Sequence, residues 1–559
     1  MDVVLTNARV VDGTGKDPEV ADVGLGDGVI EAVGDLRAEQ ARTEVIDLDG
    51  LVLCPGFIDA HTHYDAQITW EGSLAPSSWH GVTTVIIGNC GFGIAPARPA
   101  HRELLVRTLE NVEGMSYTAL SEGIDWQFES FGEYLDMIEA RPKRCNVGVL
   151  VGHTPVRVYV MGDEAVKRPA TPAEVEEERS VVEGALNAGA VGFSSSKTDV
   201  HVGADGGPVP SYRATNEEIK HLARALPRVG HGVFQFTWGP EFWLTELLEV
   251  SRDISPRPVV LTALLDGFNQ PLRGLTNDEV LAELDRDGGD VWPQVSCRPL
   301  VFQMTLEDPF ILAQGRTAFQ EVLARPREER AALYRDNGWR ERAKGQLGAD
   351  WADRWTRTTV QETRVHEEIR NGPTVASLAE DRGMDAFDLV VELALADDLA
   401  TRFRIVLYNY DDVAVGRLLK HPRTLISLSD AGAHSSQLCD ANFGTFLLEK
   451  WVRELGVLTL PEAVHQLTQV PARLFGLDRR GVIRPGYRAD LVAFDPATVG
   501  STEVERVWDQ PGGADRLVAY SHGIEAVWIG GTQTRAGGVD LVDSNPGRLI
   551  RGGRASREM

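Results

Sequence analysis

The segment that decides the fold is Pro55–Asp65, with the sequence PGFIDAHTHYD. A short apolar run ends here, and His61 and His63 follow two residues apart. Alternate side chains of a strand lie on the same face, so both imidazoles point to the same side. Two imidazoles that converge at the carboxyl end of a barrel strand can bind one metal ion. A bare His-x-His spacing would also fit two surface histidines, whereas the whole string is far more specific.

Strand-like and helical segments alternate along most of the chain. Apolar runs typical of strands occupy residues 145–152, 190–196, 232–238, 257–264, 403–409 and 424–430. Helical segments include residues 172–189, 216–230 and 384–398. Such alternation predicts an α/β fold with a parallel sheet and crossover helices, either a closed barrel or an open sheet. No glycine-rich phosphate-binding string opens a helix, which disfavours a nucleotide-binding fold.

Three regions differ from this alternation. Both chain ends carry short runs of Val, Ile and Leu separated by Gly-Asp or Asp-Gly turns, a pattern that predicts short strands. Residues 300–375 are charged, helical and rich in Trp, and we expect them to form a lid inserted between barrel elements. Residues 541–559 are expected to be a loose tail.

Composition limits the partners. The net charge of −27 over 559 residues disfavours nucleic acid and anionic membranes as partners. No apolar stretch is long enough to span a membrane, and the N-terminus lacks the pattern of a signal peptide. The five cysteines are scattered and odd in number, which predicts a reducing, cytoplasmic location. The sequence is compatible with a homo-oligomer.

Several strings together resemble one family. GFIDAHTHYDAQ, HGVTTVIIGNCGFGIAPARP, VGHTPVRVYVMG, LISLSDAGAH and the segment 468–496 resemble the D-aminoacylase, or N-acyl-D-amino-acid deacylase, branch of the amidohydrolase superfamily. The resemblance covers nearly the whole chain and is weakest in the middle. It implies a metal-dependent TIM-type (β/α)8 barrel, here residues 56–479. It also implies a small β-sandwich formed from both chain ends, here 1–55 and 480–540.

The resemblance adds two metal-site residues to the histidine pair. It implies that Cys90 ligates or bridges the metal; a thiolate near a strand end can approach a cation, which lowers its pKa. The alternative is a buried apolar cysteine. It also implies that Asp430 binds the metal and takes the proton from the attacking water. The alternative is a turn-forming or helix-capping aspartate. Imidazole, carboxylate and thiolate ligands together favour zinc.

The chain also departs from the family. The resembling enzymes carry two more metal-binding histidines near the positions of Gln235 and Thr262, so we expect one tight ion rather than two. Groups that clamp a substrate carboxylate are not found, so the substrate is not expected to be a simple N-acyl-D-amino acid. Lys197 ends a strand and has three interpretations: a carbamylated metal ligand, an ammonium that binds substrate, or a solvated loop lysine.

Further candidates for substrate contacts are His434, His201, Gln235 and Trp238. His434 could equally be a loop histidine, and Asp205 lies in the same loop as His201. Trp238, with Phe242 and Trp243, is expected to line an apolar wall. His153 is expected to be a structural hydrogen-bonding residue.

The favoured function is therefore hydrolysis of a C–N amide bond in an N-acylated amino compound. Two alternatives stay open. One is hydrolysis of a cyclic amide or imide, which a lysine carbamate with two metals would support. The other is a metal-poor, non-catalytic binding protein, because two histidines are missing.

Overall fold

The structure, a computed structural model, describes residues 1–204, 206–268 and 272–553, and at 349 and 350 only the backbone. Eight parallel strands form one sheet in the order β16-β12-β11-β10-β9-β8-β7-β6. The strands are β6 (Phe57–Asp59), β7 (Val82–Ile87), β8 (Asn146–Gly152), β9 (Gly192–Ser196), β10 (Val233–Thr237), β11 (Val259–Thr262), β12 (Val291–Val295) and β16 (Leu425–Ile426). A parallel bridge between Thr62 and Ala431 joins the segments that follow β6 and β16. This bridge brings the two edges of the parallel sheet together, which agrees with the predicted TIM-type barrel.

The barrel strands are buried on both faces because helices cover the outside of the sheet. These helices include α1 (Arg102–Glu113), α3 (Phe131–Ala140), α4 (His153–Met161), α5 (Pro172–Ala188), α6 (Asn216–Ala223), α7 (Ala225–Val229), α8 (Leu244–Asp253), α9 (Asn277–Asp287) and α16 (Asp412–Lys420). Capping boxes fix where several of them begin: Thr171 with Glu174 starts α5, and Thr276 with Glu279 starts α9. The helix expected at 172–189 is α5, and the one expected at 216–230 is divided into α6 and α7.

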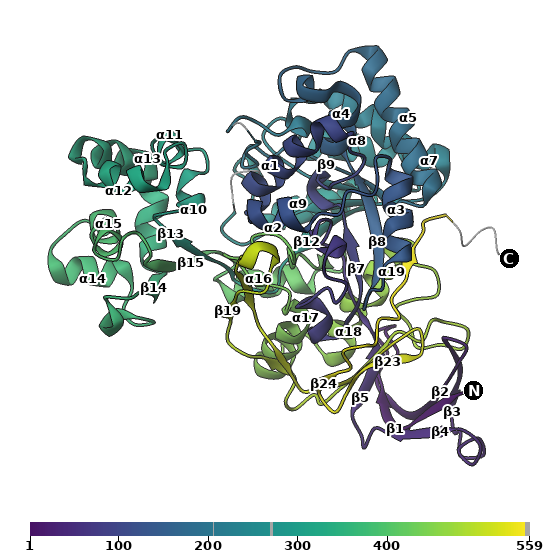
Figure 1. The fold of residues 1–559 in the computed structure, drawn as a ribbon. Helices are drawn as coiled ribbons and strands as arrows, with labels where there is room; N and C mark the ends of the chain where they lie inside the picture. The colour runs from purple at the N-terminus through teal and green to yellow at the C-terminus, as the bar shows by residue number, and fades with distance from the viewer. Residues whose placement is uncertain (205, 269–271, 554–559) are drawn as a thin grey trace.

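A lobe inserted between β12 and β16 projects to one side of the barrel (Figure 1). It contains the antiparallel sheet β13-β15-β14, formed by Leu300–Thr305, Arg402–Tyr408 and Thr358–Glu362. Helices α11 (Thr317–Leu323), α12 (Arg327–Arg335), α13 (Asn337–Trp355), α14 (Val375–Arg382) and α15 (Ala386–Ala396) pack with it around a separate core. The expected lid at 300–375 is therefore part of a longer insertion that extends to Tyr408.

The assignment of 403–409 to the parallel sheet was wrong. This run is β15, an antiparallel strand of the inserted lobe, and β12 takes its place in the barrel. The physical reason is visible in the sequence, because Arg402 and Arg404 alternate with buried Phe403 and Ile405. A strand with one polar face belongs to a sheet covered on one side, whereas barrel strands are buried throughout.

The two chain ends form a second sheet together. Its order is β24-β23-β22-β17-β5-β1-β2-β3, with β4 also paired to β1. The strands are β1 (Val3–Val10), β2 (Glu19–Gly26), β3 (Val29–Gly34), β4 (Glu44–Asp47), β5 (Val52–Pro55), β17 (Leu491–Phe494), β22 (Ile524–Ile529), β23 (Thr532–Ala536) and β24 (Val539–Asp540). The joint sheet agrees with the strands expected at both ends, while the β-sandwich stays a prediction.

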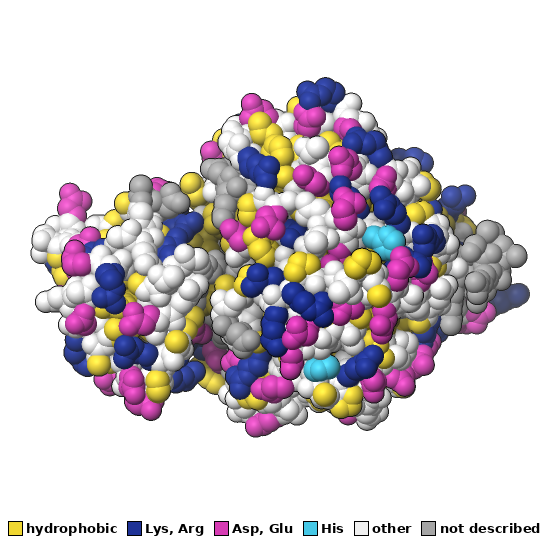
Figure 2. All heavy atoms as spheres, turned by 90° about the horizontal axis from the view of Figure 1, so that it is seen from above, with side chains coloured by type: hydrophobic (Ala, Val, Ile, Leu, Met, Phe, Trp, Pro, Cys, Tyr) yellow, Lys and Arg dark blue, Asp and Glu magenta, His cyan; other side chains and the backbone are white. Residues whose placement is uncertain are grey.

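The expectation of a loose tail at residues 541–559 was only partly correct. Leu549–Ile550 forms β25, which pairs in parallel with β8 at Val147 and Gly148. Residues 554–559 lie outside the described part. In that part, no helix is both long and apolar enough to cross a membrane. Figure 2 shows acidic and basic side chains intermixed over one face, so the net negative charge is not gathered there into a single patch.

Candidate active site

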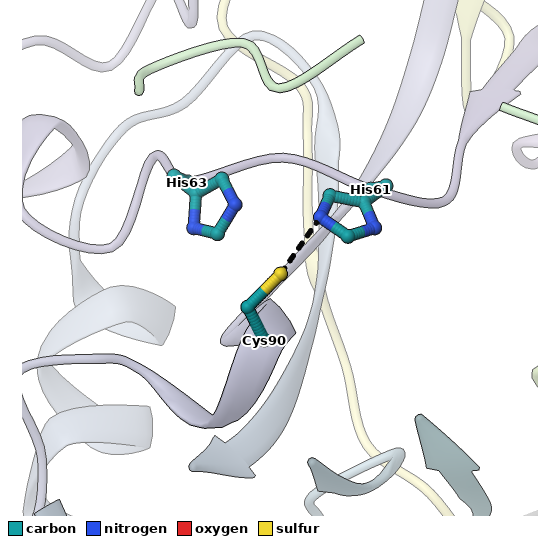
Figure 3. Close-up of side chains that lie close together, drawn as sticks. All are labelled: His61, His63 and Cys90. Atoms are coloured by element: carbon teal, nitrogen blue, oxygen red, sulfur yellow. Dashed lines mark hydrogen bonds between the residues drawn. The ribbon is translucent and has the colours of Figure 1, made fainter. Parts of the chain in front are cut away.

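The structure brings together the four residues expected to bind a metal. His61 and His63 follow β6, Cys90 follows β7 and Asp430 follows β16. His61 Nε2 lies 3.3 Å from Cys90 Sγ and 3.3 Å from Asp430 Oδ1. His63 Nε2 lies 3.8 Å from the same Asp430 oxygen. Figure 3 shows the two imidazoles on one segment and the Cys90 sulfur directed toward them.

Backbone geometry explains the sequence around Cys90. This residue sits in a short 3-10 helix, Asn89–Gly91, with a φ of 55°. Two nearby glycines, Gly88 and Gly91, pack against the barrel. A Cβ on Gly91 would lie 2.9 Å from Ser195 Cα, and one on Gly88 would clash with Leu150 O. The glycines therefore let the turn approach neighbouring strands closely enough to direct the thiol into the site.

The ligand set fits a divalent cation. Burial lowers the pKa of His61 to about 4 and that of His63 well below its usual value, so both are neutral donors. Burial raises the pKa of Asp430 to about 7 and that of the Cys90 thiol well above its ordinary value. Among the described residues, no lysine or arginine pairs with Asp430. Buried acids without a basic partner are costly, and a cation on these donors would compensate them.

Glu113 is a fifth residue of the site, and sequence reasoning missed it. Its side chain is buried, and Oε1 lies 3.6 Å from His63 Nδ1. Burial, and then the nearby Asp430 and Asp65 carboxylates, raise its pKa well above the usual value. Glu113 ends α1 and belongs to no motif. The only local sign was an acid directly before Gly114, at a helix C-terminus where acids are disfavoured.

The opposite wall of the barrel is a hydrogen-bonded chain of neutral side chains. The Cys90 backbone N–H donates to Gln235 Oε1 at 2.7 Å, and Gln235 Nε2 donates to Thr262 Oγ1 at 2.7 Å. The Thr262 hydroxyl donates to Gln294 Oε1, which lies 2.8 Å from His61 Nδ1. Both ends of the Gln235 amide are thus engaged within the protein. Gln294 was also missed by sequence reasoning.

Lys197 is held as a paired cation. Its Nζ donates to Tyr212 O at 2.7 Å and to Glu241 Oε2 at 3.1 Å. A carbamate at this position would lose the ammonium donors and bring a negative charge to Glu241, which the arrangement disfavours. Burial lowers the pKa of Lys197, while Glu241 opposes that shift.

His434 and His201 are two further histidines in this part of the barrel. After burial and His61, their charges also lower the pKa of His63. His434 Nδ1 is buried and has no hydrogen-bond partner in the described part of the chain, and the ring contacts Phe302 and Phe310 of the inserted lobe. His201 contacts Phe92 and Ser196 Oγ. Asp205 lies outside the described residues.

The remaining candidates have clear environments. Trp238 directly follows β10 and is buried, and its indole Nε1 has no hydrogen-bond partner among the described residues. Phe242 packs on Phe236 in the core. His153 bridges Ser195 Oγ and Glu218 Oε1, as expected of a structural residue. His153, Glu178 and Glu218 form a second buried cluster of possible metal ligands. Arg157 pairs with Glu218 and lies 3.9 Å from Glu178, so this cluster already contains a cation.

Comparison with known proteins identifies the family. An amidohydrolase family model matches residues 44–535. D-aminoacylase of Alcaligenes xylosoxydans xylosoxydans is 30% identical over 90% of this chain and 89% of its own length. A solved D-aminoacylase, described with a binuclear metal centre, one-metal activation and second-metal attenuation, has a TM-score of 0.68 at 27% identity. The match covers 98% of this chain and 99% of that one.

A second solved relative was studied with zinc. N-acyl-D-glutamate deacylase from Bordetella bronchiseptica, in complex with zinc and a phosphonate inhibitor, has a TM-score of 0.67 at 26% identity over 99% of both chains. The chain therefore belongs to the amidohydrolase family and is similar to its D-aminoacylase-like members. The prediction of a metal-dependent hydrolase that acts on a non-peptide C–N amide bond is confirmed at this level.

Proposed function

We propose that the protein hydrolyses the amide bond of an N-acylated amino compound with a single zinc ion. His61, His63, Cys90 and Asp430 would hold the ion, since imidazole, thiolate and carboxylate together suit zinc. The observation that carries the proposal is the convergence of their donor atoms, with Asp430 Oδ1 within 3.8 Å of both imidazoles. Zinc bound there supplies Lewis-acid activation of water and of the amide carbonyl.

Asp430 is proposed as the general base and then the general acid. Its side chain is 23% exposed, whereas those of His61 and His63 are 0% and 3% exposed. It is therefore the group in the set that solvent and substrate reach most readily. A carboxylate in this position can take the proton of the attacking water and return it to the leaving nitrogen.

The substrate is proposed to be larger and more apolar than a simple N-acyl-D-amino acid. Two narrow cavities beside Asp430 and His63 have mixed linings, with apolar side chains such as Leu438, Met115 and Leu120 next to polar ones such as Gln67 and Ser435. The basic side chain in these linings, Arg516, is committed to Glu71 and Asp509. A free substrate carboxylate would lack a cationic partner here, so its desolvation would not be compensated.

Two groups remain available for substrate hydrogen bonds, which supports the proposed contacts. The Trp238 indole Nε1 and His434 Nδ1 are both buried without a partner among the described residues. We propose His201 as a third contact, because burial and then the charges of His434 and His61 lower its pKa to about 3. Gln235 would act on substrate only indirectly, through the Cys90 turn whose N–H it accepts.

The domain division is proposed on the same basis. Residues 1–55 and 480–540 would form a β-sandwich beside a barrel of 56–479, and the insertion would act as a lid. The contacts of Phe302 and Phe310 with His434 support the lid, because they connect the inserted lobe directly to the site. A cytoplasmic location is proposed from the five buried free cysteines.

The test is a hydrolysis assay on acylated amines, N-acetyl-D-methionine and cyclic amides, before and after zinc removal by a chelator. We expect the bulkier neutral amides to be hydrolysed best and the activity to return when zinc is restored. Efficient turnover of N-acetyl-D-methionine, with kcat/KM of about 10⁴ M⁻¹s⁻¹ or more, would contradict the substrate proposal. Preferred opening of a cyclic amide would replace it with the alternative chemistry.

A further inference from the structure

The two histidines of the site share one orientation. His61 and His63 both turn Nε2 toward Asp430, at 3.3 Å and 3.8 Å. Each then presents Nδ1 to an oxygen atom on the outer side. For His61 this is Gln294 Oε1 at 2.8 Å, and for His63 it is Glu113 Oε1 at 3.6 Å.

The polarity of these outer contacts decides which nitrogen carries the proton. Gln294 Oε1 is an acceptor, because the other end of that amide donates to Ser427 Oγ. His61 must therefore donate from Nδ1, which leaves the Nε2 lone pair for a cation. An acceptor oxygen of Glu113 facing His63 Nδ1 favours the same tautomer, because two facing lone pairs would repel each other. At 3.6 Å, Glu113 Oε1 lies beyond hydrogen-bond distance of the neutral His63 ring, so the contact orients the ring electrostatically.

Glu113 also contacts the other side of the site. Its backbone carbonyl accepts the N–H of His434, four residues beyond Asp430. The next residue, Gly114, has a φ of 54°, and a Cβ there would lie 3.0 Å from His434 Nδ1. The C-terminus of α1 is thus wedged between His63 and the segment that carries Asp430.

We propose that Glu113 is a positioning residue that fixes the tautomer and orientation of His63 and links it to the Asp430 segment. It acts through His63 rather than on the substrate. Outer partners of metal-binding histidines typically contribute about 10- to 100-fold to metal affinity. The inference rests on the proposed metal function, but zinc affinity can be measured without any substrate.

The experiment compares Glu113→Ala and Glu113→Gln with the wild type by zinc competition against a chromophoric chelator. Glu110→Ala is the matched control, because Glu110 lies on the same helix and, of the residues that the structure describes, its side chain forms an ion pair only with Arg107. We expect Glu113→Ala to weaken zinc binding about 10- to 100-fold. Glu113→Gln, which keeps an acceptor oxygen, should recover a large part of that loss. Glu110→Ala should match the wild type.

The outcomes separate this inference from the proposed function. Wild-type zinc affinity in Glu113→Ala would overturn it, as would equal losses in the Ala and Gln variants. If Glu113→Ala does not fold, Glu113→Asp decides, because its shorter side chain withdraws the oxygen from His63 Nδ1; wild-type zinc affinity in that variant would overturn the inference. A wild type that binds zinc tightly but cleaves no amide would contradict only the proposed function. A wild type without zinc affinity would contradict both.

Discussion

The two walls of the barrel mouth differ in chemistry. On one wall, the segments that follow β6, β7 and β16 present histidine, cysteine and aspartate, the proposed metal ligands. On the other wall, Gln235, Thr262 and Gln294 of β10, β11 and β12 donate and accept hydrogen bonds among themselves. At its two ends, the neutral wall forms hydrogen bonds with His61 Nδ1 and with the Cys90 backbone N–H, so it contacts two of the proposed metal ligands. Neutral side chains at these strand ends can thus orient the proposed metal ligands, although they are not proposed as ligands themselves.

The largest expected effect breaks the ligand wall. Asp430→Asn keeps the size of the side chain but removes the proposed base. Hydrolysis should fall by about 10²–10⁴-fold, the usual scale for loss of a general acid–base group. Steady-state kinetics on a substrate of the wild type measures this, with circular dichroism as the control for folding. Near-normal turnover would show that another group takes the proton.

A smaller effect is expected from the neutral wall. Gln294→Leu preserves volume but removes the acceptor for His61 Nδ1. Zinc affinity should fall by about 10- to 100-fold, because His61 is no longer held in its tautomer. Gln303→Leu is the control, since Gln303 in β13 of the inserted lobe is also buried but accepts from Arg506 of the C-terminal segment. If both variants bind zinc equally well, the neutral wall does not orient the ligands.

The smallest effect is expected at Lys197, which belongs to neither wall. Lys197→Met removes the ammonium that donates to Tyr212 O and Glu241. The number of zinc ions per chain should not change, because a paired ammonium binds no metal. Elemental analysis of the variant beside the wild type measures this number. Loss of bound metal would instead identify Lys197 as a carbamylated ligand.

The sequence predicted the ligand wall better than the neutral one. His61, His63, Cys90 and Asp430 each end a strand inside a distinctive string, and closure of the barrel brings strand ends together. Glu113 and Gln294 lie on separate elements without a motif. Only the tertiary packing of α1 and β12 turns them toward the histidines, so no local pattern could reveal them.

The same contrast holds for the fold. Barrel strands such as β8 and β11 are buried, largely apolar runs, and the sequence located them. The run at 403–409 was also recognised as a strand, but its partners were wrong because they come from distant parts of the insertion. Its alternating arginines carried the information that separates a one-sided sheet from a barrel.

The measurement that tests the central claim most directly is the number of tightly bound metal ions per chain. Protein purified without a chelator, and a sample reconstituted with excess zinc and then desalted, would be analysed for metal by mass spectrometry. With Gln235 and Thr262 engaged in hydrogen bonds rather than free as ligands, we predict about one ion per chain in both samples. Two tightly held ions would contradict the account, because a second site would then exist that the neutral wall cannot supply.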